Sequence, residues 1–231
     1  MQTTDSNIIL GIQDLSCGYG GKPVVENFNL QVRKGDCIAI TGPNGCGKST
    51  LLRAIYQLCV INSGTISFNG HLLNGKTPEQ VKKLGIAYFM QKNAVFSKLS
   101  IKENLLLSLN GTRITDISQK IEEMIALFPD IGKWQNKTAG LLSGGQRQQL
   151  SMAMLLSQNA ELWLLDEFTA GLDNEKSETF AELILQHSGK TSDNPKTIIF
   201  VEHKINIINQ LAKRILNINN EVIVNTKIEK V

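Results

Sequence analysis

The stretch GPNGCGKS at residues 42–49 constrains the fold of this chain more than any other feature of its sequence. It fits the pattern G-x-x-x-x-G-K-S and lies between the apolar run CIAI and a segment with helical spacing. Glycines let a backbone wrap closely around phosphate oxygens, Lys48 neutralises phosphate charge, and Ser49 offers a hydroxyl to a divalent cation. The pattern predicts a strand–loop–helix unit that binds nucleotide phosphates; the alternative is a glycine-rich turn in an unrelated fold.

The periodicity of the apolar residues predicts an α/β fold. Strand-like runs occupy residues 7–16, 24–32, 36–42, 63–70, 84–91, 161–167, 196–203 and 214–220. Helical spacing occurs at residues 101–109, 116–128, 144–158, 174–188 and 204–213. The early strands suggest a partly antiparallel sheet, whereas the late ones alternate with helices as in a mostly parallel sheet. A further helix should begin at Gly47 and carry on one face Leu51, Leu52, Ile55 and Leu58.

The composition argues against several classes of function. Of the 231 residues 42% are hydrophobic, and the net charge is only +3, which gives no general attraction to nucleic acid or anionic lipid. The four cysteines form no CxxC pair, so we expect reduced thiols and no zinc site. No signal-peptide pattern opens the sequence, and no apolar run approaches the ~18 residues of a membrane span. We therefore expect a soluble chain that would need a partner for any role at a membrane.

Two adjacent carboxylates, Asp166 and Glu167, end the apolar run LWLL. Burying them is costly unless a cation or a proton-transfer task uses them. A Mg²⁺ ion would explain Asp166, and Glu167 would then be placed to polarise a water that attacks a γ phosphate. The alternative is a pair of carboxylates that simply end a strand in solvent.

A second glycine turn, LLSGGQRQQL at residues 141–150, also runs into a helix. The free N–H groups and the dipole at a helix N-terminus favour negative charge, so this turn is a second candidate anion site. Residues 42–49 already provide a phosphate loop, so this turn raises the question of which phosphate a second site would bind.

Together these motifs resemble the ATP-binding cassette (ABC) ATPases, in the order in which that family carries them. Tyr19 resembles the aromatic residue that stacks on adenine, Gln91 the Q-loop glutamine, and His203 the switch histidine. Asp166 and Glu167 match the Walker B aspartate and the catalytic glutamate. The Walker A loop comprises Gly42, Pro43, Asn44, Gly45, Cys46, Gly47, Lys48, Ser49 and Thr50. The family signature comprises Leu142, Ser143, Gly144, Gly145 and Gln146, and the D-loop ends at Asp173.

The resemblance implies a P-loop NTPase (RecA-like) fold with a mostly parallel sheet, an antiparallel β subdomain and an inserted helical subdomain. Residues 1–231 would form one ATPase domain, with the core and β subdomain at 1–91 and 159–231 and the helical signature subdomain at 92–158. The implied cofactors are ATP and Mg²⁺.

The resemblance also implies a role for each motif. Ser49 and Gln91 would bind Mg²⁺, and Asp166 would bind it through water. Lys48 would bind the phosphates, Glu167 the attacking water and His203 the γ phosphate. Two subunits would meet head to tail, as a homodimer or a paralogous heterodimer, so that each signature binds the partner's ATP. Asp173 would communicate between the two sites.

Within the family, the sequence resembles a transporter subunit. The short helical insert lacks the heptads of the coiled-coil branches, and one cassette is present instead of two. Residues 91–105, QKNAVFSKLSIKENL, resemble the segment that receives the coupling helix of an integral membrane subunit, which implies a peripheral position on the inner face of the cell membrane. AGLD and VEH resemble branched-chain amino acid and lipopolysaccharide-export subunits. The alternative is a soluble assembly or regulatory ATPase of the iron–sulfur type.

Three residues depart from the family pattern. Phe168 and Asn174 stand where Pro is frequent, and Lys204 follows His203 where an acidic residue is common. None of them removes a reacting group. Because Pro would fix a backbone angle at 168, we expect the departures to affect turnover more than ATP binding.

Overall fold

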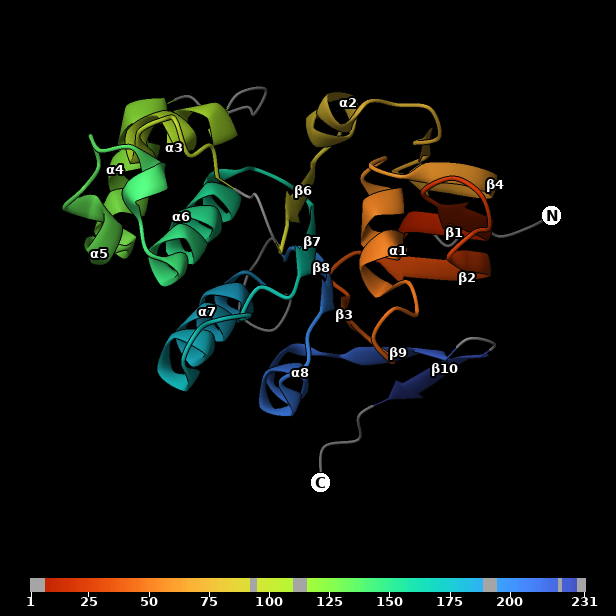
Figure 1. The fold of residues 1–231 in the computed structure, drawn as a ribbon. Helices are drawn as coiled ribbons and strands as arrows, with labels where there is room; N and C mark the ends of the chain where they lie inside the picture. Colours follow the sequence, from red (N-terminus) through yellow and green to blue (C-terminus); the bar gives the residue numbers. More distant parts are fainter. Residues whose placement is uncertain (1–6, 92–94, 110–115, 189–194, 220–221, 228–231) are drawn as a thin grey trace.

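The structure is a computed structural model, and it describes residues 7–91, 95–109, 116–188, 195–219 and 222–227 (Figure 1). Two sheets organise these residues, one of six strands in the order β10-β9-β3-β8-β7-β6 and one of four in the order β2-β1-β4-β5. Residues 92–94 of the segment expected to receive a membrane subunit, and residue 220 of the last predicted strand, lie outside the described residues.

The six-stranded sheet is parallel except for β10, which runs antiparallel to β9. Its strands are β3 (Cys37–Thr41), β6 (Ile86–Phe89), β7 (Leu162–Asp166), β8 (Thr197–Val201), β9 (Arg214–Asn219) and β10 (Val222–Lys227). All residues of β7 and β8 are buried, which agrees with their unbroken apolar runs, because helices or a second sheet cover both faces of a parallel sheet. The predicted mostly parallel sheet is confirmed.

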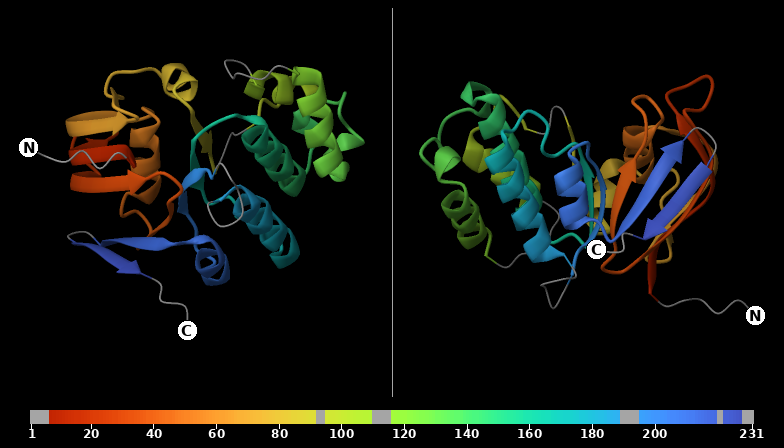
Figure 2. Two further views of the ribbon diagram at one scale, coloured as in Figure 1. Left: turned by 180° about the vertical axis from the view of Figure 1, so that it is seen from behind. Right: turned by 90° about the horizontal axis from the view of Figure 1, so that it is seen from below.

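The four-stranded sheet is antiparallel, as the early runs suggested. Its strands are β1 (Ile8–Gly18), β2 (Val25–Arg33), β4 (Val60–Phe68) and β5 (His71–Leu72). Burial alternates along β2, so one face packs on the core and the other meets solvent. This sheet lies beside α1 and away from the helices that follow β6 (Figures 1 and 2).

In the part of the chain that the structure describes, four α-helices and a 3₁₀ turn lie between β6 and β7, and the other helices flank the strands. The helices are α1 (Lys48–Ile55), α2 (Pro78–Lys83), α3 (Ile101–Leu109), α4 (Ile117–Leu127), α5 (Pro129–Gly132), α6 (Gly144–Ser157), α7 (Asn174–His187) and α8 (Ile205–Leu211), and the 3₁₀ turn is η1 (Ala139–Leu141). Within the described residues, no helix combines the length and the apolar character that a membrane crossing requires.

The helix after the phosphate loop is shorter than its apolar spacing predicted. α1 ends at Ile55, and Leu58, expected on its buried face, is 41% exposed. The N–H group of Leu58 donates to the carbonyl of Arg53, and Gln57 between them adopts a φ of 59°. This tight turn ends the helix and carries the chain toward β4, which a spacing rule for helices does not register.

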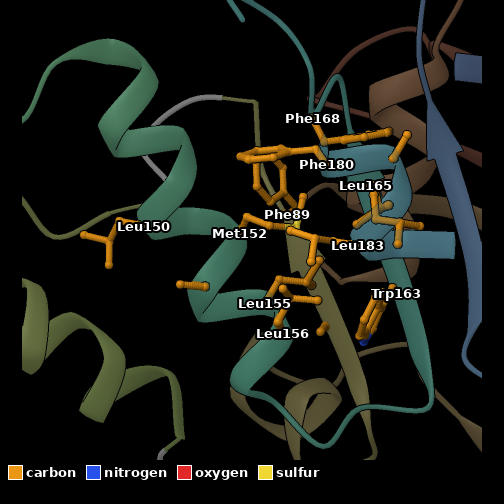
Figure 3. Close-up of a cluster of buried hydrophobic side chains, with 14 of the residues drawn as sticks. Phe89, Leu150, Met152, Leu155, Leu156, Trp163, Leu165, Phe168, Phe180 and Leu183 are labelled. Carbon is orange, nitrogen blue, oxygen red and sulfur yellow. The ribbon is translucent and has the colours of Figure 1, made fainter. Parts of the chain in front are cut away.

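Side chains alternate strictly across the six-stranded sheet and divide the core in two. On β7, Trp163 and Leu165 join a cluster with α6 and α7, whereas Leu162 and Leu164 join a cluster with α1 and the antiparallel sheet. Figure 3 shows the first cluster, in which Met152 and Leu155 of α6 approach the aromatic and aliphatic side chains of β6, β7 and α7. The helices α1 and α6 therefore pack on opposite faces of one sheet.

Candidate functional site

The loop between β3 and α1 closes around the ammonium group of Lys48. The Nζ atom donates to the carbonyl oxygens of Gly42 and Pro43 at 2.9 and 2.8 Å, and Lys48 is only 6% exposed. Gly47, the residue before α1, has a φ of 101°, a conformation that glycine adopts without strain. The sequence thus places a buried positive charge inside a backbone loop at the start of a helix, the arrangement of an anion site.

Asp166, the last residue of β7, faces this loop and is held through both carboxylate oxygens. Ser49 Oγ donates to Oδ1 at 2.8 Å, and the hydroxyl of Tyr88 on β6 donates to Oδ2 at 3.2 Å. Burial raises the pKa of Asp166, and the hydrogen bonds from Ser49 and Tyr88 oppose that rise. A hydroxyl and a carboxylate in contact are hard oxygen donors of the kind that Mg²⁺ prefers, so these residues fit that ion.

Glu167 gathers two further residues that the sequence singled out. The amide Nε2 of Gln91 donates to one of its carboxylate oxygens, and Nε2 of His203 lies 3.3 Å from the other. The three residues follow the carboxyl ends of β7, β6 and β8, which are neighbours in the sheet. Glu167 has a φ of 48°, an uncommon conformation for a residue with a side chain, and its N–H donates to the carbonyl of Val201.

The second glycine turn forms the N-terminus of α6. Ser143 and Gln146 make a capping box, in which each side chain accepts a hydrogen bond from the other's backbone N–H group. A first helical turn has no intrahelical acceptors for its N–H groups, and the capping box leaves those of Gly144 and Gly145 available. The helices α6 and α1 pack on opposite faces of the sheet, so the two glycine turns begin helices of different layers.

Known proteins share the sequence pattern of much of this chain. The ABC transporter family pattern matches residues 25–170 of the chain. The probable branched-chain amino acid transport ATP-binding protein LivF of Archaeoglobus fulgidus is 36% identical over 192 residues, which cover 83% of this chain and 80% of that protein. The chain belongs to the ABC transporter family. The cytochrome c biogenesis ATP-binding export protein CcmA of Brucella abortus is 33% identical over 180 residues, 77% of this chain and 79% of its own.

Solved ABC cassettes share the fold. The ATP-binding cassette MJ0796, in a dimeric post-hydrolysis state bound to ADP and Pi, superposes with a TM-score of 0.84 at 22% identity, over 96% of this chain and 100% of that one. A nucleotide-free cassette from an ABC transporter gives a TM-score of 0.78 at 22% identity, over 95% and 91% of the two chains. The predicted fold class is confirmed, and the chain is an ATP-binding ABC ATPase.

Tyr19, expected to stack on adenine, lies at the end of β1 and is 55% exposed. Arg53 of α1 donates from Nη1 to the Tyr19 hydroxyl at 2.6 Å, and its guanidinium carbon is 5.9 Å from the centre of the ring. The hydrogen bond to Tyr19 raises the pKa of Arg53. Arg53 thus holds the Tyr19 side chain in place while much of its surface stays exposed.

Three residues that the sequence reasoning did not single out as contacts hold the D-loop of this ABC ATPase. Glu202, 5% exposed, accepts hydrogen bonds from the N–H and Oγ1 of Thr169 at 3.2 and 2.8 Å. Gln148 of α6 donates to the carbonyl of Ala170 at 2.6 Å. Lys204 donates to the carbonyl of Leu172 at 3.1 Å. A signal for Glu202 was available, since a carboxylate directly after a buried strand needs partners.

Two of the three departures from the family pattern, Lys204 and Phe168, make defined contacts. Lys204 also donates to Ser177 Oγ at 2.6 Å, so its positive charge ties the D-loop to α7. Phe168 is fully buried and packs edge-to-face on Phe200 with ring centres 6.3 Å apart. Asp173 caps α7 by accepting from the N–H of Lys176 at 2.8 Å, and this hydrogen bond lowers the pKa of its carboxyl. The expected communication by Asp173 between two sites stays a prediction.

Of the Walker A glycines, Gly42 is the one at which an added Cβ atom would lie closest to another atom, and it gives a first testable prediction. Its φ is 147°, and a Cβ atom there would lie 2.5 Å from the carbonyl oxygen of Ile218 and 2.9 Å from Sγ of Cys46. We expect Gly42→Ala to lower the free energy of unfolding by about 2–4 kcal/mol, because overpacking adds to backbone strain. Urea denaturation followed by circular dichroism measures it.

Gly45 in the same loop provides the matched control. Its φ is 83°, but a Cβ atom would meet no described atom within 4 Å. Gly45→Ala should therefore lose only about 1 kcal/mol, the strain of the left-handed conformation. Equal losses for the two variants would show that the contact with Ile218 is unimportant.

Proposed function

We propose that this ABC ATPase works as a head-to-tail pair that clamps two ATP molecules and drives a membrane transporter. The observation that carries the proposal is the placement of its two glycine turns. The Walker A loop and the signature turn start helices on opposite faces of one sheet, so each turn needs a partner surface to enclose the same phosphate. MJ0796, which shares the fold, is dimeric in its post-hydrolysis state.

In this proposal the Walker residues bind the nucleotide. The loop amides and Lys48 hold the phosphates. When nucleotide binds, Lys48 donates to phosphate oxygens in place of the loop carbonyls to which it donates here. Ser49 and the carbonyl oxygen of the Gln91 amide would bind Mg²⁺, and Asp166 would bind it through a water molecule. When bound, Mg²⁺ neutralises charge on the β and γ phosphates. The exposed ring of Tyr19 stacks on the base.

Hydrolysis is assigned to the cluster around Glu167. Its carboxylate accepts a proton from the attacking water, while Gln91 and His203, which already contact it, orient that water and the γ phosphate. The partner's Ser143, Gly144 and Gly145 contact the γ phosphate from the opposite side. Loss of that phosphate removes contacts to both subunits, so the pair opens and its partner proteins move.

Membrane subunits are the proposed partners. LivF and CcmA, by their names, are ATP-binding proteins of transport and export systems. A hollow of about 580 Å³ runs along the Q-loop and the start of α6, lined by Gln91, Val95, Ser97 and Arg147, among others. Phe96 beside it is 53% exposed. We assign this hollow to a segment of the membrane chain, which would hold the ATPase on the inner face of the membrane.

Co-purification tests the partner assignment. Tagged chain expressed with its native gene neighbours should bring down an integral membrane protein from detergent extracts. Phe96→Asp should reduce that capture at least fivefold, whereas Leu127→Asp, on the exposed end of α4, should not. Capture of soluble scaffold proteins alone would favour the soluble assembly ATPase instead.

A further inference from the structure

Tyr88 on β6 contacts the Walker B aspartate through its hydroxyl, which donates to Asp166 Oδ2 at 3.2 Å. The charge of Arg53, whose Nη1 donates to the Tyr19 hydroxyl at 2.6 Å, opposes the rise in the pKa of Tyr88.

Tyr88 is built to act as a hydrogen-bond donor. Its ring packs against Tyr56 with centres 5.4 Å apart and an interplanar angle of 53°. Burial first, and then the charge of Asp166, raise the pKa of Tyr88. The hydroxyl therefore keeps its proton in the physiological range, and the neighbouring ring limits where it can point.

The two oxygens of Asp166 have separate partners, and this separation determines what Tyr88 does. Oδ1 contacts Ser49 and Oδ2 contacts Tyr88. Asp166 is 1% exposed, so without the Tyr88 hydroxyl its Oδ2 would be a buried charged oxygen short of a donor. The carboxylate would then rotate or recruit another partner. The orientation of Asp166 toward Ser49 thus depends on Tyr88.

We propose that Tyr88 is a positioning residue that orients Asp166 for Mg²⁺. The inference rests on the proposed function, which makes Ser49 and Asp166 the metal-binding residues. It assigns the hydroxyl of Tyr88, and not only its ring, to the metal site.

Tyr88→Phe tests the hydroxyl alone, and Tyr56→Phe is the matched control. Both substitutions remove one hydroxyl from the same pair of rings, but within the described residues the Tyr56 hydroxyl makes no hydrogen bond. Binding of methylanthraniloyl-ADP is titrated by fluorescence without Mg²⁺ and at increasing Mg²⁺. In Tyr88→Phe, the Kd for the nucleotide without Mg²⁺ should stay within twofold of wild type. The Mg²⁺ concentration that gives half of the maximal increase in nucleotide binding should rise about 5–10-fold. Tyr56→Phe should change neither value more than twofold.

The remaining outcomes separate the inference from the function on which it rests. The inference is overturned if Tyr88→Phe needs the same Mg²⁺ concentration as wild type, or if Tyr56→Phe shifts that concentration as much as Tyr88→Phe does. In either case the proposed function stands as long as nucleotide binding by the wild type depends on Mg²⁺. A wild-type protein whose nucleotide binding and hydrolysis ignore Mg²⁺ overturns the metal assignment itself. Thermal unfolding midpoints within about 3 °C of wild type establish that the variants are folded.

Discussion

Glu167→Gln is expected to bind ATP with nearly wild-type affinity and to hydrolyse it at least about 100-fold more slowly. Gln has the shape of Glu but no carboxylate to accept a proton from water. The hydrogen bond from Gln91 would be exchanged for an amide–amide contact, so the local structure should persist. Because ATP stays intact between the two subunits, the variant should accumulate as a closed dimer.

Steady-state phosphate release and size-exclusion chromatography with ATP measure both effects. Glu175→Gln, on the exposed first turn of α7, is the control for loss of one negative charge and should retain full turnover. Undiminished hydrolysis by Glu167→Gln would remove the role given to Glu167. A monomer that persists with ATP would instead contradict the proposed clamp.

Ser143→Arg is expected to leave ATP binding by the monomer intact while reducing dimer formation and hydrolysis below detection. An arginine at this position fills the space above the N–H groups of Gly144 and Gly145 with a bulky side chain. The monomer's own Walker A loop precedes α1, which packs on the other face of the sheet from α6, so its contacts with ATP should be unaffected. Fluorescent nucleotide binding at low protein concentration and steady-state phosphate release measure the two quantities.

The chain supplies a close control for the lost helix cap. Thr77 and Gln80 form the same capping box at the start of α2 as Ser143 and Gln146 do at α6. Thr77→Arg should therefore cost similar stability, about 1 kcal/mol, without affecting hydrolysis. Loss of nucleotide binding by monomeric Ser143→Arg would mean that the signature has been placed in the wrong subunit's site.

The strands that position the site could be predicted because the signals for them are local in the sequence. β3, β7 and β8 are short, mainly apolar runs, and each ends at or shortly before residues that belong to a recognisable motif, such as Lys48 after β3 and Asp166 on β7. Gln91 and His203 both contact Glu167 because all three follow adjacent parallel strands, which end at one edge of the sheet.

What the sequence missed depends on contacts between distant residues or on short signals. Lys204 reaches a carbonyl 32 residues earlier, and Arg53 reaches Tyr19 34 residues before it, so neither contact leaves a local pattern. The helix α2 has only six residues, and the signals for it stand at its two ends: a capping box and a proline at the start, and two lysines in the last turn. Leu58 fitted the spacing of α1, but the turn at Gln57 stopped the helix first.

The two glycine turns begin helices on opposite faces of the sheet, and this separation also determines how ATP hydrolysis responds to dilution of the protein. A site that one molecule cannot close for itself makes the turnover per molecule rise with protein concentration, until pairs predominate. Two cassettes attached to one transporter meet at a high local concentration, whatever their abundance in the cell. The same ATPase would thus be nearly idle when free and active when attached, which confines ATP consumption to assembled transporters.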